Sequence, residues 1–80
     1  MNVAQAVAYI IEELCNERHM APNALANLAG VPPMTIYSIL NGKSKNPGIT
    51  SIKAICDCLE IPLKAFFDNP LFDNLEQEIV

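Results

Sequence analysis

The sequence predicts an all-α protein, a compact bundle of five helices followed by a short tail. Apolar residues recur at helical spacing, prolines and glycines separate the helical segments, and no β-hairpin pattern or internal repeat occurs. A chain of 80 residues, 51% of them hydrophobic and 18% charged, suits a single folded domain. We expect this domain to cover residues 1–68 and an acidic amphipathic tail to cover residues 69–80.

The first two predicted helices differ in length. One covers about residues 3–18, where apolar residues lie on one face and the glutamates lie off it. A shorter helix follows from Pro22, because a proline at the first helical position loses only an N–H that has no partner within the helix. Gly30 should end this second helix in the left-handed conformation that glycine adopts most easily.

Prolines also mark the starts of later helices. Pro33 opens a third helix over about residues 33–41, which Asn41-Gly42 ends before the polar loop KSKNPG. Pro62 opens a fifth helix of one turn. Between them, the apolar stripe of a fourth helix consists of Ile49, Ile52, Ile55, Cys56 and Leu59.

Composition argues against an enzyme and against a metal or other cofactor. His19 is the only histidine, no carboxylate pair accompanies it at ligand spacing, and the three glycines form no phosphate-binding loop. We expect His19 to interact with the dipole at the end of the first helix. The cysteines are odd in number and lack the spacing of a disulfide framework; we expect Cys56 in the core and Cys58 at the surface.

The absence of two sequence signals predicts a cytoplasmic location. No apolar run approaches the roughly 18 residues that span a bilayer, and no signal peptide precedes the first helix. We therefore expect a small binding module in the cytoplasm.

Charge is distributed unevenly along the chain. The net charge is −4, yet residues 21–53 contain three lysines and no acidic residue. Such asymmetry favours a surface that faces a polyanion. With so few charges, chance is the alternative explanation.

The segment from Pro22 to Asn41 has the pattern of a helix-turn-helix. Two short helices are joined by a turn that contains Gly30 and one apolar residue, Val31. Small residues at Ala26 and Ala29 permit close helix approach. The outer face of the third helix is then free to enter a major groove, which is about as wide as a helix.

The chain resembles the phage Cro/CI repressor-type helix-turn-helix domains, also called the XRE family, over about residues 5–68. The joint order and spacing of several short features carry this resemblance. These are Leu25-Ala26, Ala29-Gly30-Val31, Thr35-Ile36, Ile39, Asn41-Gly42-Lys43, Asn46-Pro47, the pair Ile52 and Ile55, and the closing Leu63-x-x-Phe66-Phe67.

The resemblance implies a lambda repressor-like fold that binds double-stranded operator DNA as a homodimer and regulates transcription, with repression the favoured sign. The third helix would be the recognition helix. It implies base contacts from Met34, Thr35, Tyr37 and Ser38. It implies phosphate contacts from Asn23, Asn41, Lys43, Ser44 and Lys45.

The sequence departs from the family pattern at both helices of the motif. Pro22 and Pro33 stand where many members have polar side chains, and Ser38 and Leu40 replace a common arginine and glutamate late in the third helix. The recognition helix therefore carries no charge, and bidentate arginine–guanine contacts from it are impossible. We expect weak monomeric affinity and a shallow dependence on salt.

Several residues have a simpler alternative role. Tyr37 could fill space between helices, Lys43 and Lys45 could be solvated loop charges, and Asn41 could serve only to end its helix. Met34 could contact a partner protein, or could simply be tolerated at the surface.

At the level of the whole chain, the rival function is a protein-interaction module, antitoxin-like or an adaptor, with weak or no DNA binding. The tail is predicted either to fold back onto the domain or to aid dimerisation through exposed Leu71, Phe72 and Leu75. Its acidic residues would be repelled by phosphates.

Overall fold

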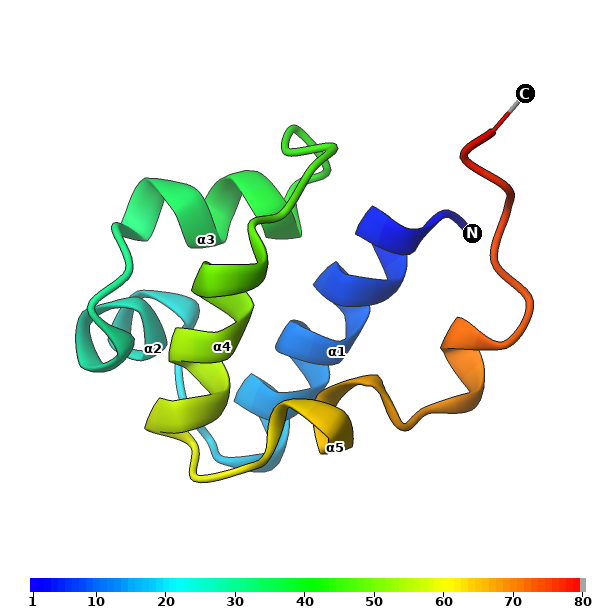
Figure 1. Cartoon of the computed structure of the whole chain (residues 1–80). Coiled ribbons are helices and arrows are strands. Elements are labelled where there is room, and N and C mark those ends of the chain that lie inside the picture. Colours follow the sequence, from blue (N-terminus) through cyan, green and yellow to red (C-terminus); the bar gives the residue numbers. More distant parts are fainter. Residues whose placement is uncertain (80) are drawn as a thin grey trace.

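Five α-helices and one 3-10 helix form the regular structure of residues 1–79, the residues that the computed structural model describes. No strand occurs in this part of the chain. The elements are α1 (Val3–Glu17), α2 (Pro22–Ala29), α3 (Pro33–Leu40), α4 (Ile49–Cys58), α5 (Leu63–Phe67) and η1 (Pro70–Phe72) (Figure 1). The predicted fold class is confirmed, and the helices begin and end close to the bounds expected from apolar periodicity and from the prolines and glycines.

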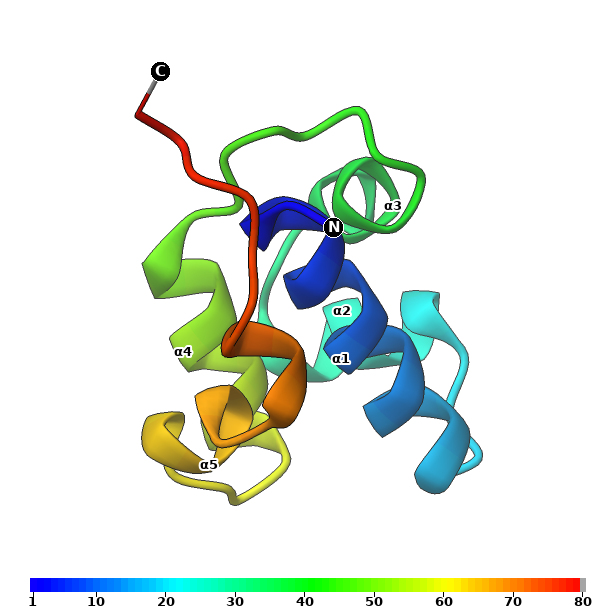
Figure 2. The ribbon, with the colours of Figure 1, turned by 90° about the vertical axis from the view of Figure 1, so that its right-hand side faces the viewer.

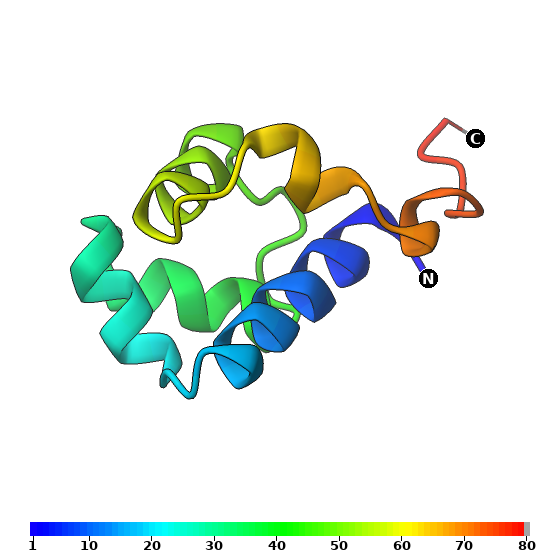
Figure 3. The same cartoon turned by 90° about the horizontal axis from the view of Figure 1, so that it is seen from below.

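The helices enclose one core from two sides. Seen from below, α1, α2 and α3 lie on one side of the molecule, and α4 and α5 lie on the other (Figure 3). α3 packs against α1 and α2, and α2 also packs against α4. Helix α3 is thereby held at one end of the molecule with only its inner side in contact with the bundle (Figure 1).

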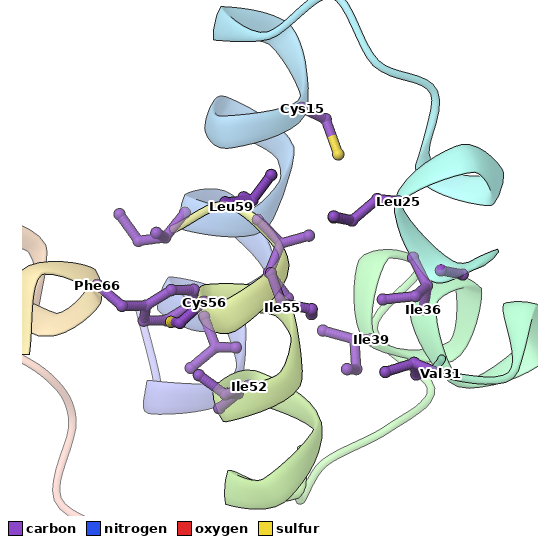
Figure 4. Packing of buried hydrophobic residues seen from close by; sticks show 14 residues of the cluster. Cys15, Leu25, Val31, Ile36, Ile39, Ile52, Ile55, Cys56, Leu59 and Phe66 are labelled. Carbon is purple, nitrogen blue, oxygen red and sulfur yellow. The ribbon is translucent and has the colours of Figure 1, made fainter. Parts of the chain in front are cut away.

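The core is made only of apolar side chains. Every α-helix contributes to it, and no polar or charged side chain is buried among residues 1–79. Figure 4 shows Leu25, Ile36, Ile39 and Ile55 meeting where α2, α3 and α4 converge. Burial of apolar surface is the main force that fixes the helices relative to one another.

The turn at the end of α2 has the conformation that the sequence predicts. Gly30 adopts φ 71°. The Gly30 N–H donates to the Asn27 carbonyl at 3.4 Å, and the Val31 N–H donates to the Ala26 carbonyl at 2.9 Å. This pair of bonds is a Schellman motif, which satisfies carbonyls that the end of the helix leaves free.

Helices α1 and α4 end with the same pair of bonds but without a glycine. His19 with φ 52° and Glu60 with φ 59° occupy the left-handed position. His19 is exposed directly after α1. The sequence gives no signal for these two turns, because glycine is the residue that ordinarily marks them.

The tail folds back onto the domain. The alternative prediction, that Leu71, Phe72 and Leu75 are exposed, is wrong, because all three are half-buried. Leu71 and Phe72 pack against the core, and the Phe72 ring meets Phe67 edge to face with centroids 5.1 Å apart. Within residues 69–79 only one 3-10 turn forms, and the Asn69 side chain caps it by accepting from the Leu71 N–H at 2.9 Å. The argument for dimerisation through the tail required these side chains to be exposed, and it therefore no longer holds.

Beyond η1 the tail runs past the first turn of α1 (Figure 2). The Glu76 N–H donates to the Met1 carbonyl at 3.1 Å. The Glu76 carboxylate lies 3.0 Å from the α-amino group of Met1. Side chain and main chain thus hold the tail beside the start of α1.

Candidate nucleic-acid interface

The turn between α2 and α3 is built from one glycine, one buried residue and two prolines. Val31 is buried and anchors the turn to the core, as predicted. Pro32 precedes α3 in an extended conformation, and Pro33 is its first residue. Because Ala26 is also fully buried and small, α2 and α3 approach closely.

Helix α3 has one buried face and one free face. Ile36 and Ile39 are buried in the core. Met34 is 77% exposed and Tyr37 46% exposed, whereas Thr35 and Ser38 are half-buried. The free face is defined by Met34, Tyr37, Ser38 and Asn41, whose spacing of three, four and seven residues places them on one side of a helix. Tyr37 is not a filler between helices.

The loop after α3 folds back onto that helix. The Ser44 N–H donates to the Ser38 carbonyl at 2.9 Å. The Asn41 side-chain oxygen accepts from the Lys43 N–H at 3.0 Å, so this oxygen serves the turn. In Figure 1 the loop lies above the end of α3, and Figure 2 shows it running from there across the molecule to α4. The loop bonds therefore hold the start of the loop, with Lys43, at the C-terminal end of α3.

Lys43 and Lys45 are the cations of the loop that follows α3. Both are exposed, and neither forms an ion pair within residues 1–79. Lys53, by contrast, pairs with Asp57 one helical turn further along α4. No acidic residue lies between residues 21 and 53, so the acidic side chains nearest the loop come from other segments: Glu12 and Glu78 line the same groove as Lys45.

Asn23 is the one predicted site residue that lies outside α3 and its loop. It is exposed at the second position of α2. The other predicted residues, Met34, Thr35, Tyr37, Ser38, Asn41, Lys43, Ser44 and Lys45, follow one another along α3 and the loop.

A groove that the sequence does not reveal runs beside the lysine loop. It has a volume of about 610 Å³ and lies between α1 and the end of α3. Tyr9 lines it from α1, Asn41 and Lys45 line it from the loop, and Glu78 lines it from the tail. No local pattern could have found this juxtaposition, because it joins segments that are far apart in the sequence.

The remaining reactive side chains form no second site. Cys15 and Cys56 are buried, and burial raises the pKa of each thiol, with a smaller contribution from Glu12 to the pKa of Cys15 and from Asp57 to that of Cys56. Cys58 is half-buried rather than at the surface. Among residues 1–79 no group of three metal-ligating side chains comes together. None of the helices in that range is long and apolar enough to cross a membrane.

Comparison with known proteins agrees with this geometry. Among solved structures, the chain is similar to the crystal structure of the prophage Lp1 protein 11, with 32% identity and a TM-score of 0.81 over 94% of this chain and 100% of that chain. No curated protein gives a significant match. A family model described as a Cro/C1-type HTH DNA-binding domain matches residues 11–68. The chain therefore belongs to the Cro/C1-type helix-turn-helix family of DNA-binding domains, which comprises DNA-binding regulators.

Proposed function

We propose that the protein is a sequence-specific transcription regulator that inserts α3 into the major groove of operator DNA. The observation that carries this proposal is the free face of α3, bordered at its C-terminal end by two unpaired lysines. Membership in a family of DNA-binding domains supports it. A DNA partner in turn favours the cytoplasm as its location.

Base contacts in this proposal come from α3. A major groove accepts a helix, and the N-terminal residues of a recognition helix contact base edges. Met34 and Thr35 lie in the first turn of α3, and Tyr37 and Ser38 lie in the second. The phenol and the hydroxyls can donate or accept hydrogen bonds at base edges.

Phosphate contacts in this proposal come from the loop and from α2. Lys43 and Lys45 supply charge, while Ser44 and the amide of Asn41 supply hydrogen-bond donors. Asn23 would contact the backbone from the start of α2. So few cations predict a modest electrostatic contribution and a shallow salt dependence.

Dimerisation and repression complete the proposal. A symmetric dimer would place two copies of α3 in successive major grooves, with half-sites about one helical turn apart. Two such contacts would compensate for the weak binding expected of a single uncharged recognition helix. Occupying a promoter in this way is sufficient to block transcription.

The test is selection from random duplex DNA at low salt, followed by fluorescence anisotropy on the recovered sequence. We expect a palindrome. Tyr37→Ala should weaken binding by about 1–3 kcal/mol and relax specificity at one position. Lys43→Ala should weaken binding to all sequences and lower the slope of log Kd against log salt by about 0.9 for each subunit of the proposed dimer.

Lys64→Ala is the matched control, because it removes an exposed lysine from α5, outside the motif. It should leave both affinity and slope unchanged. Failure to enrich any duplex at low salt would instead favour the second candidate, a protein-interaction module such as an antitoxin-like or adaptor protein. The uncharged α3 and the net charge of −4 are the observations that favour this second candidate.

A further inference from the structure

The first turn of α3 presents an unusual chemistry for a surface that contacts DNA. Met34 is 77% exposed there, although it is a large apolar side chain. Pro32 and Pro33 beside it are exposed and carry no side-chain donor or acceptor. No charged residue lies anywhere on α3. Apart from the half-buried Thr35, the exposed side chains of this turn offer only carbon and sulfur to whatever they meet.

Position within the helix matters as much as chemistry. Met34 is the second residue of α3 and lies on the free face, one turn before Tyr37 and Ser38. The N-terminal residues of a recognition helix are the ones that contact base edges. Met34 is therefore placed to meet a base edge, whereas the lysines after α3 are placed to meet the phosphates.

Only one group in the major groove is apolar. Adenine, guanine and cytosine present hydrogen-bonding groups there, while thymine adds a C5-methyl group. A flexible thioether side chain packs well against an irregular apolar surface. Facing a guanine or cytosine edge, the same side chain would remove water from polar groups without replacing their hydrogen bonds.

We infer that Met34 selects thymine in the operator by packing on its C5-methyl group, an inference that rests on the proposed DNA-binding function. Each half-site of the operator then has thymine at the position that the first turn of α3 contacts. Specificity there comes from contact with a methyl group instead of a charged bidentate hydrogen bond. Tyr37 and Ser38 then contact the neighbouring base pairs.

The alternative is that a partner protein covers the exposed Met34 side chain. The surroundings favour DNA, because Lys43 and Lys45 lie in the loop that follows the same helix and neither forms an ion pair within the described residues. A DNA duplex offers a partner to both groups at once, because its methyl groups can contact Met34 while its phosphates contact the lysines.

The experiment replaces thymine by deoxyuridine, which removes the methyl group and leaves every hydrogen-bonding group in place. In the duplex recovered by selection, each thymine is replaced in turn and Kd is measured by fluorescence anisotropy. For the wild-type protein we expect one thymine per half-site whose replacement weakens binding about fourfold, the value of one buried methyl group. Met34→Ala should bind the thymine and deoxyuridine duplexes equally well.

Leu28→Ala is the matched control, because Leu28 is 67% exposed on α2, the other helix of the motif. This variant should keep the fourfold preference for thymine. Two results overturn the inference while the proposed function stands: tight binding with no deoxyuridine effect, or a deoxyuridine effect that persists in Met34→Ala. Failure of the wild-type protein to bind any duplex overturns the proposed function and this inference together.

Discussion

Four residues end helices in the left-handed region of the backbone, and only two of them are glycines. Gly30 and Gly42 have φ of 71° and 80°, while His19 and Glu60 have φ of 52° and 59°. A side chain in this region costs about 1–2 kcal/mol per residue, a cost that glycine avoids. His19 and Glu60 therefore carry strain that their Schellman bonds and the surrounding packing must offset.

This difference predicts opposite effects for two substitutions. Glu60→Gly should stabilise the protein by about 0.5–1 kcal/mol, because the relief of strain exceeds the added freedom of the unfolded chain. Gly30→Ala should destabilise it by a similar amount, because an added Cβ meets nothing within 4 Å and only the φ angle resists it. Urea denaturation of both variants checks this. Equal effects of the same sign would contradict the argument.

The two buried thiols predict how stability depends on pH. Burial raises the pKa of Cys15 and Cys56 above the value in the unfolded chain. The folded state therefore keeps these protons when the unfolded state loses them, so stability is full below about pH 8.5 and falls as the pH rises further. Unfolding free energies measured at pH 7 and pH 9.5 should show this loss. The loss of unfolding free energy between the two pH values should be smaller in the Cys15→Ala, Cys56→Ala double variant and should persist in Cys58→Ala.

At the scale of elements, the 3-10 turn η1 of the tail packs against the folded domain. Phe72 packs against the core and contacts Phe67, which in turn contacts Phe66 edge to face with centroids 4.9 Å apart. The three rings connect the tail to α5 and to the interior. Tail docking is thus an intramolecular contact that contributes to stability.

Truncating this contact should destabilise the monomer. Phe72→Ala should cost about 1–2 kcal/mol, less than for a fully buried ring because Phe72 is only half-buried. Ile79→Ala is the control and should cost almost nothing, since Ile79 is 86% exposed. Thermal denaturation measures both. Sedimentation of Phe72→Ala should show the wild-type oligomeric state, and a shift to monomer would restore the dimer role that the packing argues against.

Sequence reasoning predicted the helices well and the contacts between distant segments poorly. The order of helices follows from prolines that open α2 and α3 and from Gly30, because the conformational rules for these residues act locally. The turns at His19 and Glu60 were missed because their residues carry no local preference for that conformation. Tail docking and the groove beside Lys45 depend on tertiary packing, which no local rule contains.

In the candidate site, too, local features could be predicted from the sequence and contacts between segments could not. The free face of α3 could be predicted from helical periodicity, which separates Met34 and Tyr37 from Ile36 and Ile39. The return of the loop to Ser38 could not, because it depends on one hydrogen bond within an irregular segment. Which of these residues contact bases and which contact phosphates stays a prediction.

At the scale of the whole molecule, opposite charges meet at one groove. Glu78 of the tail lines the groove that Lys45 lines from the other side. In the proposed complex with DNA, a carboxylate beside Lys45 lowers the positive potential that the loop presents to phosphates. The tail is therefore expected to weaken DNA binding by long-range electrostatics alone.

Neutralising this carboxylate should strengthen DNA binding. Glu78→Gln should lower Kd about twofold at low salt, and the effect should vanish at high salt, where charges beyond the Debye length are screened. Glu17→Gln makes the same charge change at the far end of α1 and should leave Kd unaltered. Fluorescence anisotropy at several salt concentrations distinguishes these variants. Identical Kd shifts in the two variants would point to net charge rather than position.

The purely apolar interior of the protein bears on how such a domain evolves. Since the core contains no hydrogen-bond network, no buried group constrains which side chains stand on the outer surface of α3. Under the proposed function, substitutions at its exposed positions should cost little stability, so a lineage could acquire a new operator preference by single mutations without passing through unstable ancestors.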